Sequence, residues 1–228
     1  YARLGADEHG LGVMPHLTCV GHARGERLTI LEDFATAGFC NIMALRGDPP
    51  KGETQFRPIE GGFSYASDLV SLIRENFPHF GIGVGGYPEK HPEASDQVTD
   101  LKNLKTKVDA GADFITTQLF FDNQAFFKFV SDCKKAGISI PILPGLLPAL
   151  SLGQVKRFCS MCEARLPPEL EHDLQQSEES DQPEIGADWA LDQVKELLNG
   201  GCPGFHLSAL NKSKSTLKIL EGLGRKQS

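Results

Sequence analysis

The sequence predicts an α/β fold, a TIM (β/α)8 barrel that lacks about its first two βα units and shows six strands. Short apolar segments alternate with segments of helical period along the chain, without a run of hairpins. Several helical segments end in glycine, the usual residue after a helix. A barrel unit takes ~30 residues, so two further units on the N-terminal side would complete a barrel of typical size. An open doubly wound sheet is the competing arrangement.

The predicted strands are short and apolar on both faces, as buried parallel strands are. They cover Gly12–Val20, Asn41–Leu45, Gly81–Tyr87, Phe114–Gln118, Pro141–Pro144 and Gly204–Leu207. The helical period predicts helices at Glu26–Ala37, Ser67–Glu75, Gln97–Ala110, Asn123–Ala136, Leu152–Met161, Ala187–Leu198 and Ser213–Leu223. The acidic stretch Glu169–Glu184 is predicted to be a polar loop. We expect one domain over residues 1–228, with part of the N-terminus absent because the chain opens on Tyr1 in what resembles the tail of a helix.

Composition narrows the class of protein. The net charge is −7, and no cluster of Lys and Arg predicts a nucleic-acid surface. No apolar run approaches the ~20 residues of a membrane-spanning helix, so we expect a cytoplasmic protein without a membrane partner. Among six cysteines only Cys159 and Cys162 form a Cys-x-x-Cys pair, and a structural zinc site needs a second pair. Reduced thiols that fill core space are the favoured interpretation, and no metal is expected.

The stretch Gly81–Gly86 has the spacing G-x-G-x-x-G of a dinucleotide-binding turn. In that motif the glycines sit between a strand and a helix that begins at once. Here they occupy the strand itself, and Tyr87-Pro88 follows. We therefore reject the dinucleotide motif and expect the glycines to thin the strand, so that a flat ligand or a neighbouring layer can approach.

Polar residues follow the predicted strands. The carboxyl ends of parallel strands share one face of a barrel, so these residues should gather there. Singly, each has a structural explanation: a core histidine for His16, a loop cap for Gln118, a solvated loop for His91 and Glu93. Asp100, Asn103 and Lys107 form one edge of a helix, suited to ribose or phosphate or merely solvated. Their convergence favours function, and Arg46-Gly47-Asp48 before two prolines suggests a carboxylate in fixed geometry.

A series of motifs runs in order over nearly the whole chain. It comprises His16-Leu-Thr-Cys19, Ala44-Leu-Arg-Gly-Asp-Pro49, Tyr65-Ala-Ser-Asp-Leu69, Tyr87-Pro-Glu-x-His-Pro-Glu-Ala94, the segment Asp100–Ala112, Thr117-Gln-Leu-Phe-Phe-Asp122 and Pro144-Gly-x-x-Pro148. Together these motifs resemble methylenetetrahydrofolate reductase. The resemblance implies reduction of 5,10-methylenetetrahydrofolate to 5-methyltetrahydrofolate in one-carbon and methionine metabolism. It implies ping-pong hydride transfer through FAD, with NADH or NADPH as co-substrate, in a homo-oligomer.

The resemblance also implies roles for individual residues. The flavin would contact His16, Leu45, Arg46, Gly47, Asp48, Tyr65, Ala66, Gly85, Tyr87, His91, Glu93, Ala94, Asp100, Asn103, Thr106 and Lys107. Asp48 and Gln118 would be catalytic. Asp48 would tune the flavin and stabilise a cationic iminium form of the folate. The folate would contact Asp48, Gln118, Leu152 and Lys212.

Some positions depart from the family pattern. The family's general acid is a glutamate on the first barrel strand, which is absent from this chain. The segment His206–Lys212 has Ser208 in place of an aromatic ring and a lysine in place of an arginine, and Leu152 stands where many members carry an aromatic residue. A different FAD-dependent barrel resembling proline dehydrogenase, or an inactive fragment, is the alternative. The tripeptide Arg46-Gly47-Asp48 also matches an integrin-binding sequence, which would need an exposed loop on a secreted protein.

Overall fold

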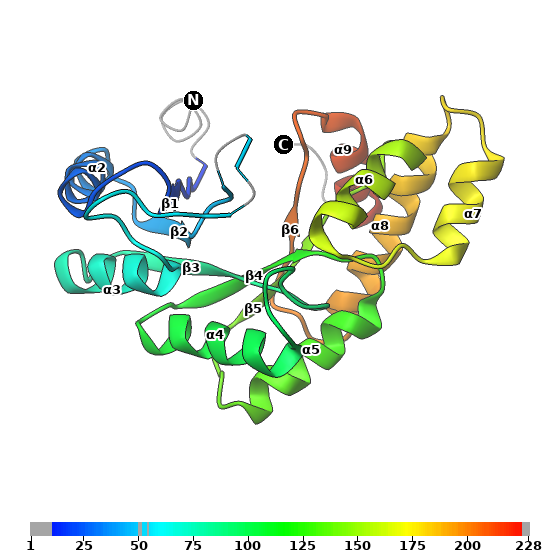
Figure 1. Cartoon of the computed structure of the whole chain (residues 1–228). Coiled ribbons are helices and arrows are strands. Elements are labelled where there is room, and N and C mark those ends of the chain that lie inside the picture. Colours follow the sequence, from blue (N-terminus) through cyan, green and yellow to red (C-terminus); the bar gives the residue numbers. More distant parts are fainter. Residues whose placement is uncertain (1–10, 50–51, 54, 225–228) are drawn as a thin grey trace. The chain divides into compact units, whose positions relative to one another are not determined.

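The computed structural model describes residues 11–49, 52–53 and 55–224 (Figure 1). The chain divides into two compact units. The first unit runs to Gly85 and also takes in Asn103–Ile115. The second unit holds Gly86–Lys102 and the chain from Thr116 onward. Among the described residues, no helix is long and apolar enough to cross a membrane.

The strands follow one another in a single sheet in the order β1-β2-β3-β4-β5-β6. Their bounds are β1 His16–Thr18, β2 Asn41–Leu45, β3 Gly81–Gly86, β4 Phe114–Leu119, β5 Ile142–Leu146 and β6 His206–Leu207. The pairs β1–β2, β2–β3 and β5–β6 are parallel. This unbroken order confirms the (β/α)8-type class, since a doubly wound sheet would reverse its strand order at one point. Strand β1 is shorter than predicted because Pro15 directly precedes it.

Helices follow the strands as predicted, with one exception. Their bounds are α2 Arg24–Thr36, α3 Ala66–Asn76, α4 Gln97–Asp109, α5 Asn123–Lys135, α6 Leu152–Cys162, α7 Pro168–Gln176, α8 Gln182–Asn199 and α9 Ser213–Gly222. The predicted loop Glu169–Glu184 was wrong, because it contains α7 and the first residues of α8. Leu170 and Leu174, four residues apart, are both fully buried, and Pro168 occupies the first turn.

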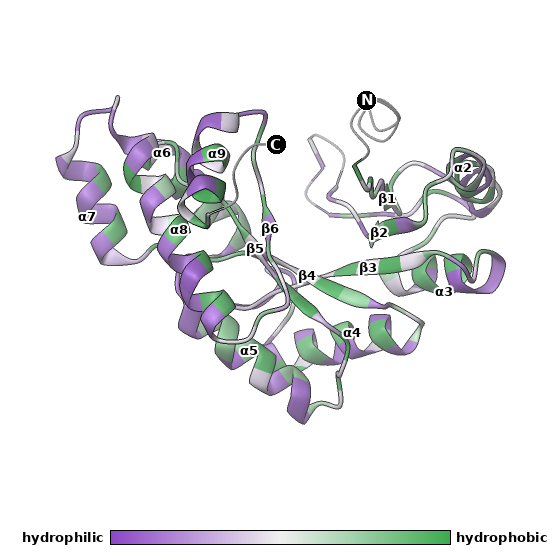
Figure 2. Ribbon diagram, turned by 180° about the vertical axis from the view of Figure 1, so that it is seen from behind, coloured by the Kyte–Doolittle hydropathy of each residue, from purple (hydrophilic) through white to green (hydrophobic). Residues whose placement is uncertain are grey.

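A hydrophobic cluster in the second unit explains why the acidic segment folds. Its buried members are Phe121, Ala149, Val155, Cys159, Leu170 and Leu174. Figure 2 shows both hydrophilic and hydrophobic residues along α7, and the buried Leu170 and Leu174 lie on one face of the helix despite its acidic composition. That face buries its leucines in the cluster, which stabilises each by about 1.5–3 kcal/mol relative to exposure.

The glycines of β3 allow close packing within the first unit. A Cβ atom on Gly83 would lie 2.5 Å from Cζ of Phe114, and one on Gly81 would lie 2.3 Å from Oδ1 of Asn41. At these two positions the predicted thinning of the strand therefore admits neighbouring protein side chains, not a ligand. Gly85 differs, because its Cβ would meet only Leu45 Cδ2, at 3.7 Å.

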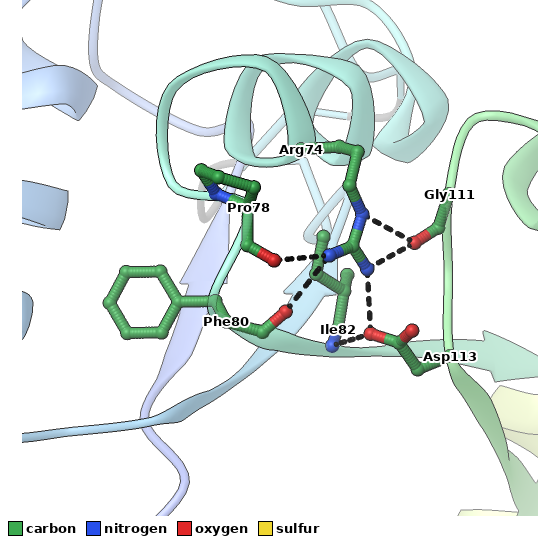
Figure 3. A network of polar contacts seen from close by, with 6 residues as sticks. All are labelled: Arg74, Pro78, Phe80, Ile82, Gly111 and Asp113. Carbon is green, nitrogen blue, oxygen red and sulfur yellow. Dashed lines mark hydrogen bonds and ion pairs between the residues drawn. The ribbon is translucent and has the colours of Figure 1, made fainter.

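A network around Arg74 joins α3 to the amino end of β3 and to the segment before β4 (Figure 3). The guanidinium donates to the carbonyls of Pro78, Phe80 and Gly111, and forms a 2.7 Å ion pair with Asp113. Asp113 Oδ2 also accepts from the backbone N–H of Ile82 at 2.7 Å. The arginine therefore fixes the turn at Gly111, whose φ of +117° favours glycine.

The cysteines are free thiols in the described chain. Cys19, Cys133 and Cys159 are buried, in agreement with a core-filling role. Cys40 is exposed, so that prediction was wrong for Cys40, which follows the end of α2 at the surface. Burial raises the pKa of Cys19 and Cys159 to about 11, and that of Cys133 to about 12.

Candidate active site

The segment that carries Asp48 is fixed by the loop after β1. The backbone N–H of Cys19 donates to the carbonyls of Leu45 (3.2 Å) and Arg46 (2.9 Å). Gly47 has a φ of +84°, and a Cβ there would lie 2.6 Å from Cγ2 of Val20. Glycine at this position therefore lets two strand ends of the first unit approach each other. Asp48 follows directly and is exposed, so its carboxylate is accessible at the end of a rigid segment.

The loop after β1 is in turn held by Arg27, a residue that the sequence did not single out. Arg27 is 0% exposed. Its guanidinium donates to the carbonyls of Thr18, Cys19 and His22, and lies 4.9 Å over the ring of Phe63. No carboxylate lies within ion-pair distance of Arg27 among the described residues, and burial lowers its pKa. The sequence of α2 does not predict that Arg27 is buried, because the groups that bind it are backbone carbonyls of the segment before the helix.

Tyr65 belongs to the same assembly of loops. The thiol of Cys19 donates to the Tyr65 carbonyl at 3.4 Å, and the Tyr65 N–H donates to Asp68 Oδ2 at 3.1 Å as α3 begins at Ala66. The backbone is therefore held by hydrogen bonds, while the residue as a whole is 67% exposed. An exposed aromatic ring on a fixed backbone is suited to stacking against a flat ligand.

A second group of predicted flavin residues also meets within the first unit. Lys107 Nζ donates to the Gly85 carbonyl at 2.5 Å, and Gly85 lies beside Leu45. Asn103 and Thr106, on the same helix, are exposed. His16 is exposed at the start of β1, which excludes the alternative that it is a satisfied core histidine.

In the second unit the loop after β3 is organised around His91. The ring of His91 lies 4.5 Å from that of Tyr87, and its backbone N–H donates to Asp100 Oδ2 at 3.0 Å. The N–H of Glu93 donates to His91 Nδ1 at 3.0 Å. This bond assigns the proton of a neutral His91 to Nε2, which then serves as a donor. Ala94 closes the turn with a 2.9 Å bond to the His91 carbonyl. Five predicted residues therefore form one cluster.

The predicted folate residues of the second unit are less closely joined. Gln118 Oε1 accepts from the N–H of Leu119, the next residue of β4, at 2.9 Å. Leu152 packs against the hydrophobic cluster of Phe121 and Val155. Lys212 is exposed directly before α9. No bond joins these three residues to one another within the described part of the chain.

The expected flavin residues thus form two clusters, each within one unit. Leu45, Gly47, Tyr65, Gly85 and Lys107 belong to the first, and the Tyr87–Ala94 loop with Asp100 belongs to the second. Residues 11–49, 52–53 and 55–224 contain no group of three or more His, Cys, Asp or Glu that could hold a metal ion. The side chains present are cations, carboxylates, an amide, a histidine and an exposed aromatic residue, a mixed polar and aromatic set that can contact a flat, phosphate-bearing cofactor.

Comparisons with known proteins identify the family of this chain. Residues 2–224 match the family profile described as "Methylenetetrahydrofolate reductase". The chain is 42% identical to "Methylenetetrahydrofolate reductase (NADH) 1" of Arabidopsis thaliana over 223 residues, covering 92% of this chain and 38% of that protein. It is 40% identical to "5,10-methylenetetrahydrofolate reductase" of Escherichia coli over 220 residues, covering 96% of this chain and 72% of that protein.

A solved structure shares the fold. It is an "Uncharacterized protein from Clostridium thermocellum" that "binds two copies of 5-methyl-5,6,7,8-tetrahydrofolic acid". Its TM-score is 0.57 at 18% identity, with 96% of this chain and 76% of that chain covered. The present chain spans only about two fifths of the length of the Arabidopsis relative. The family profile over nearly all its residues, with identities near two fifths, shows that this chain belongs to the methylenetetrahydrofolate reductase family.

Proposed function

We propose that this chain is the catalytic part of a flavin-dependent enzyme that reduces 5,10-methylenetetrahydrofolate to 5-methyltetrahydrofolate. NADH or NADPH is the reductant, in a ping-pong scheme that serves one-carbon and methionine metabolism. Family membership supports the reaction. The observation that carries the assignment of residues is the fixed segment from Leu45 to Asp48, where backbone bonds and a glycine contact leave one carboxylate accessible.

The residues of this chain fit FAD as a cofactor. At Gly85 a Cβ would meet one leucine methyl group at 3.7 Å, so this strand end is less closely packed than Gly81 and Gly83. The exposed ring of Tyr65 can stack, while Arg46 and Lys107 supply positive charge for phosphates. His91, Glu93, Asp100 and Asn103 supply further polar groups. When bound, FAD supplies the hydride chemistry, and the protein orients and tunes it.

Asp48 and Gln118 act on the folate in this proposal. A carboxylate at Asp48 stabilises the positive charge of the iminium form, because opposite charges attract strongly where water is excluded. Gln118 orients the pterin ring by hydrogen bonding, which requires its amide to exchange its present bond with the Leu119 N–H for one to substrate. Lys212 and Leu152 contact the remainder of the folate.

The test separates cofactor binding from folate chemistry. The chain is titrated with FAD, and quenching of flavin fluorescence measures affinity. Bleaching of the flavin by NADH or NADPH, and its recovery with methylenetetrahydrofolate, give the two half-reactions. We expect Asp48→Asn to retain FAD and to slow the folate half-reaction by about tenfold or more, with less effect on the NADH half-reaction. Asp33→Asn on α2, an exposed carboxylate, is the matched control. A protein that binds no FAD contradicts the proposal, as does an Asp48→Asn variant with both half-reactions unchanged.

A further inference from the structure

A cavity of about 560 Å³ lies within the second unit, apart from every residue assigned above to flavin or folate. It is lined by the segment after β4, the start of α5, the segment before α7 with the first residues of that helix, and one face of α8. Its volume falls in the range of small-molecule sites, about 300–1,000 Å³.

The wall of the cavity includes an indole ring that is held in place. Trp189 is half-buried, and its Nε1–H donates to the Phe121 carbonyl at 3.2 Å. Phe121 and Pro167, both buried, contribute apolar surface beside it. An indole is the aromatic ring that attracts cations most strongly, because its face is negative.

Two buried amides form the polar part of the lining. Asn123 and Gln193 are each 6% exposed. Asn123 Nδ2 donates to the Gln193 carbonyl and to Glu196 Oε2, and Gln193 Nε2 donates to Asn123 Oδ1 and the Phe120 carbonyl. Gln193 Oε1 accepts no bond from the described residues, and it is not among their fully enclosed atoms that lack a partner. The donors of this pair are therefore used, while one acceptor stays open on the wall of the cavity.

The charge of the lining is strongly negative. It holds four carboxylates, Asp122, Glu169, Asp192 and Glu196, and one cation, Arg165. Arg165 is already paired with Asp122. Asp192 meets Lys195 only at 3.7 Å, where both side chains are largely exposed, so this pair neutralises little. Three carboxylates on the rim thus face a cavity whose one cation is engaged.

We propose that this cavity binds an organic cation, an ammonium group on an apolar stem about the size of an aromatic ring. The stem lies against Trp189 and Pro167, and the ammonium donates to Gln193 Oε1 and the rim carboxylates. Apart from Arg165, which is paired with Asp122, the open polar groups named here are acceptors or negative charges. A phosphate or carboxylate ligand would be repelled, and a neutral apolar ligand would leave the open acceptor without a donor.

The test uses three probes that share one stem. They are phenethylammonium, phenethyl alcohol and 3-phenylpropionate, which differ mainly in head-group charge. Trp189 is the only tryptophan in the sequence, so its fluorescence reports directly on the cavity, and calorimetry covers binding that leaves fluorescence unchanged. We expect saturable binding of phenethylammonium, at least tenfold weaker binding of the alcohol and none of the anion. Raising the ionic strength from 0.05 to 0.5 M should weaken the binding of phenethylammonium, because salt screens the charges at the rim.

Variants assign the binding to this cavity. Glu169→Gln and Asp192→Asn each remove one rim charge without changing shape, and both residues are exposed, so folding should be unaffected. Each substitution should weaken the binding of phenethylammonium several-fold. Asp173→Asn on α7, an exposed carboxylate outside the lining, should have no effect. Equal affinity for the alcohol, absence of saturation by the ammonium, or unchanged affinity in both rim variants would each overturn the proposal. FAD binding is measured in parallel, and because the two sets of residues are distinct, failure of one assignment leaves the other intact.

Discussion

Two arginines of the first unit hold its loops in different ways. Arg74 lies at the amino end of β3, is partly exposed, and divides its bonds among three carbonyls and the carboxylate of Asp113. Arg27 lies behind the carboxyl end of β1, is fully buried, and contacts only carbonyls and the ring of Phe63. The difference is that the buried charge of Arg27 holds the loop near Asp48 through carbonyls, without an ion-paired carboxylate among the described residues. That loop should therefore be the more sensitive of the two to substitution.

The largest effect is expected from Arg27→Ala. The substitution leaves three carbonyls without their donor and opens a cavity in the core, so the free energy of unfolding should fall by about 3 kcal/mol or more. Arg74→Ala should cost less, because its partners are nearer to water. Urea denaturation of both variants measures the difference. A smaller loss for Arg27→Ala than for Arg74→Ala would reverse the comparison.

Substituting lysine for each of the two arginines extends the comparison from stability to FAD binding. Lysine keeps the charge but cannot reach three carbonyls with a planar fork. Since residues 18–22 hold Leu45, Arg46 and Tyr65 in place, Arg27→Lys should weaken FAD binding about tenfold, which corresponds to about 1.4 kcal/mol. Arg74→Lys, matched in chemistry, should leave FAD affinity unchanged. Flavin fluorescence titration distinguishes the two; equal losses would assign both arginines a general structural role.

The ion pair of Arg74 itself should contribute little. Its side chains are 31% and 49% exposed, and pairs in such surroundings contribute about 1 kcal/mol or less. A double-mutant cycle with Arg74→Met and Asp113→Asn should therefore give a coupling energy of at most about 1 kcal/mol. A coupling well above this would show that the carboxylate, and not the carbonyls, determines the strength of the network.

A pH-dependent effect is expected from the thiol beside Arg27. Burial raises the pKa of Cys19 in the folded chain to about 11, so the unfolded chain loses this proton first as pH rises. Stability from the protonated thiol is therefore complete below pH ~8.5 and is lost as pH rises towards 11. Denaturation in urea between pH 8 and 10.5 should show this decline, shared with Cys133 and Cys159. Cys19→Ala should reduce the slope, whereas Cys40→Ala, at an exposed position, serves as the control.

Much of the fold could be predicted because its signals are local. Strand β2 is an apolar run closed by glycine and prolines, and α5 begins at an Asp122 cap and ends before Gly137. The prediction of a loop for the acidic segment was wrong because it relied on composition. Leu170 and Leu174 are spaced as one buried helix face, although acidic residues surround them in the sequence. The candidate site residues could be predicted because they belong to short motifs. Within each unit the structure brings several of them into contact.

What the sequence could not predict depends on contacts between distant segments. Nothing in the sequence of α2 indicates that Arg27 is buried, because its acceptors are backbone carbonyls that every residue has. The cavity beside Trp189 could not be predicted either, since its lining comes from four separate segments that have no shared motif. Gln118 illustrates the converse: its motif is recognisable, but its amide bonds to the backbone of the next residue in β4 in this structure.

The carbonyl contacts of Arg27 have a consequence for how this part of the sequence can vary. A side chain that binds only main-chain oxygens imposes no identity on the residues that supply them. His22, which is exposed and contributes a carbonyl, should accept nearly any replacement in a saturation library, while position 27 should accept almost none. Positions 22 and 27 would thus differ in their tolerance to substitution. Changes of side chain in the loop would leave its backbone shape unchanged.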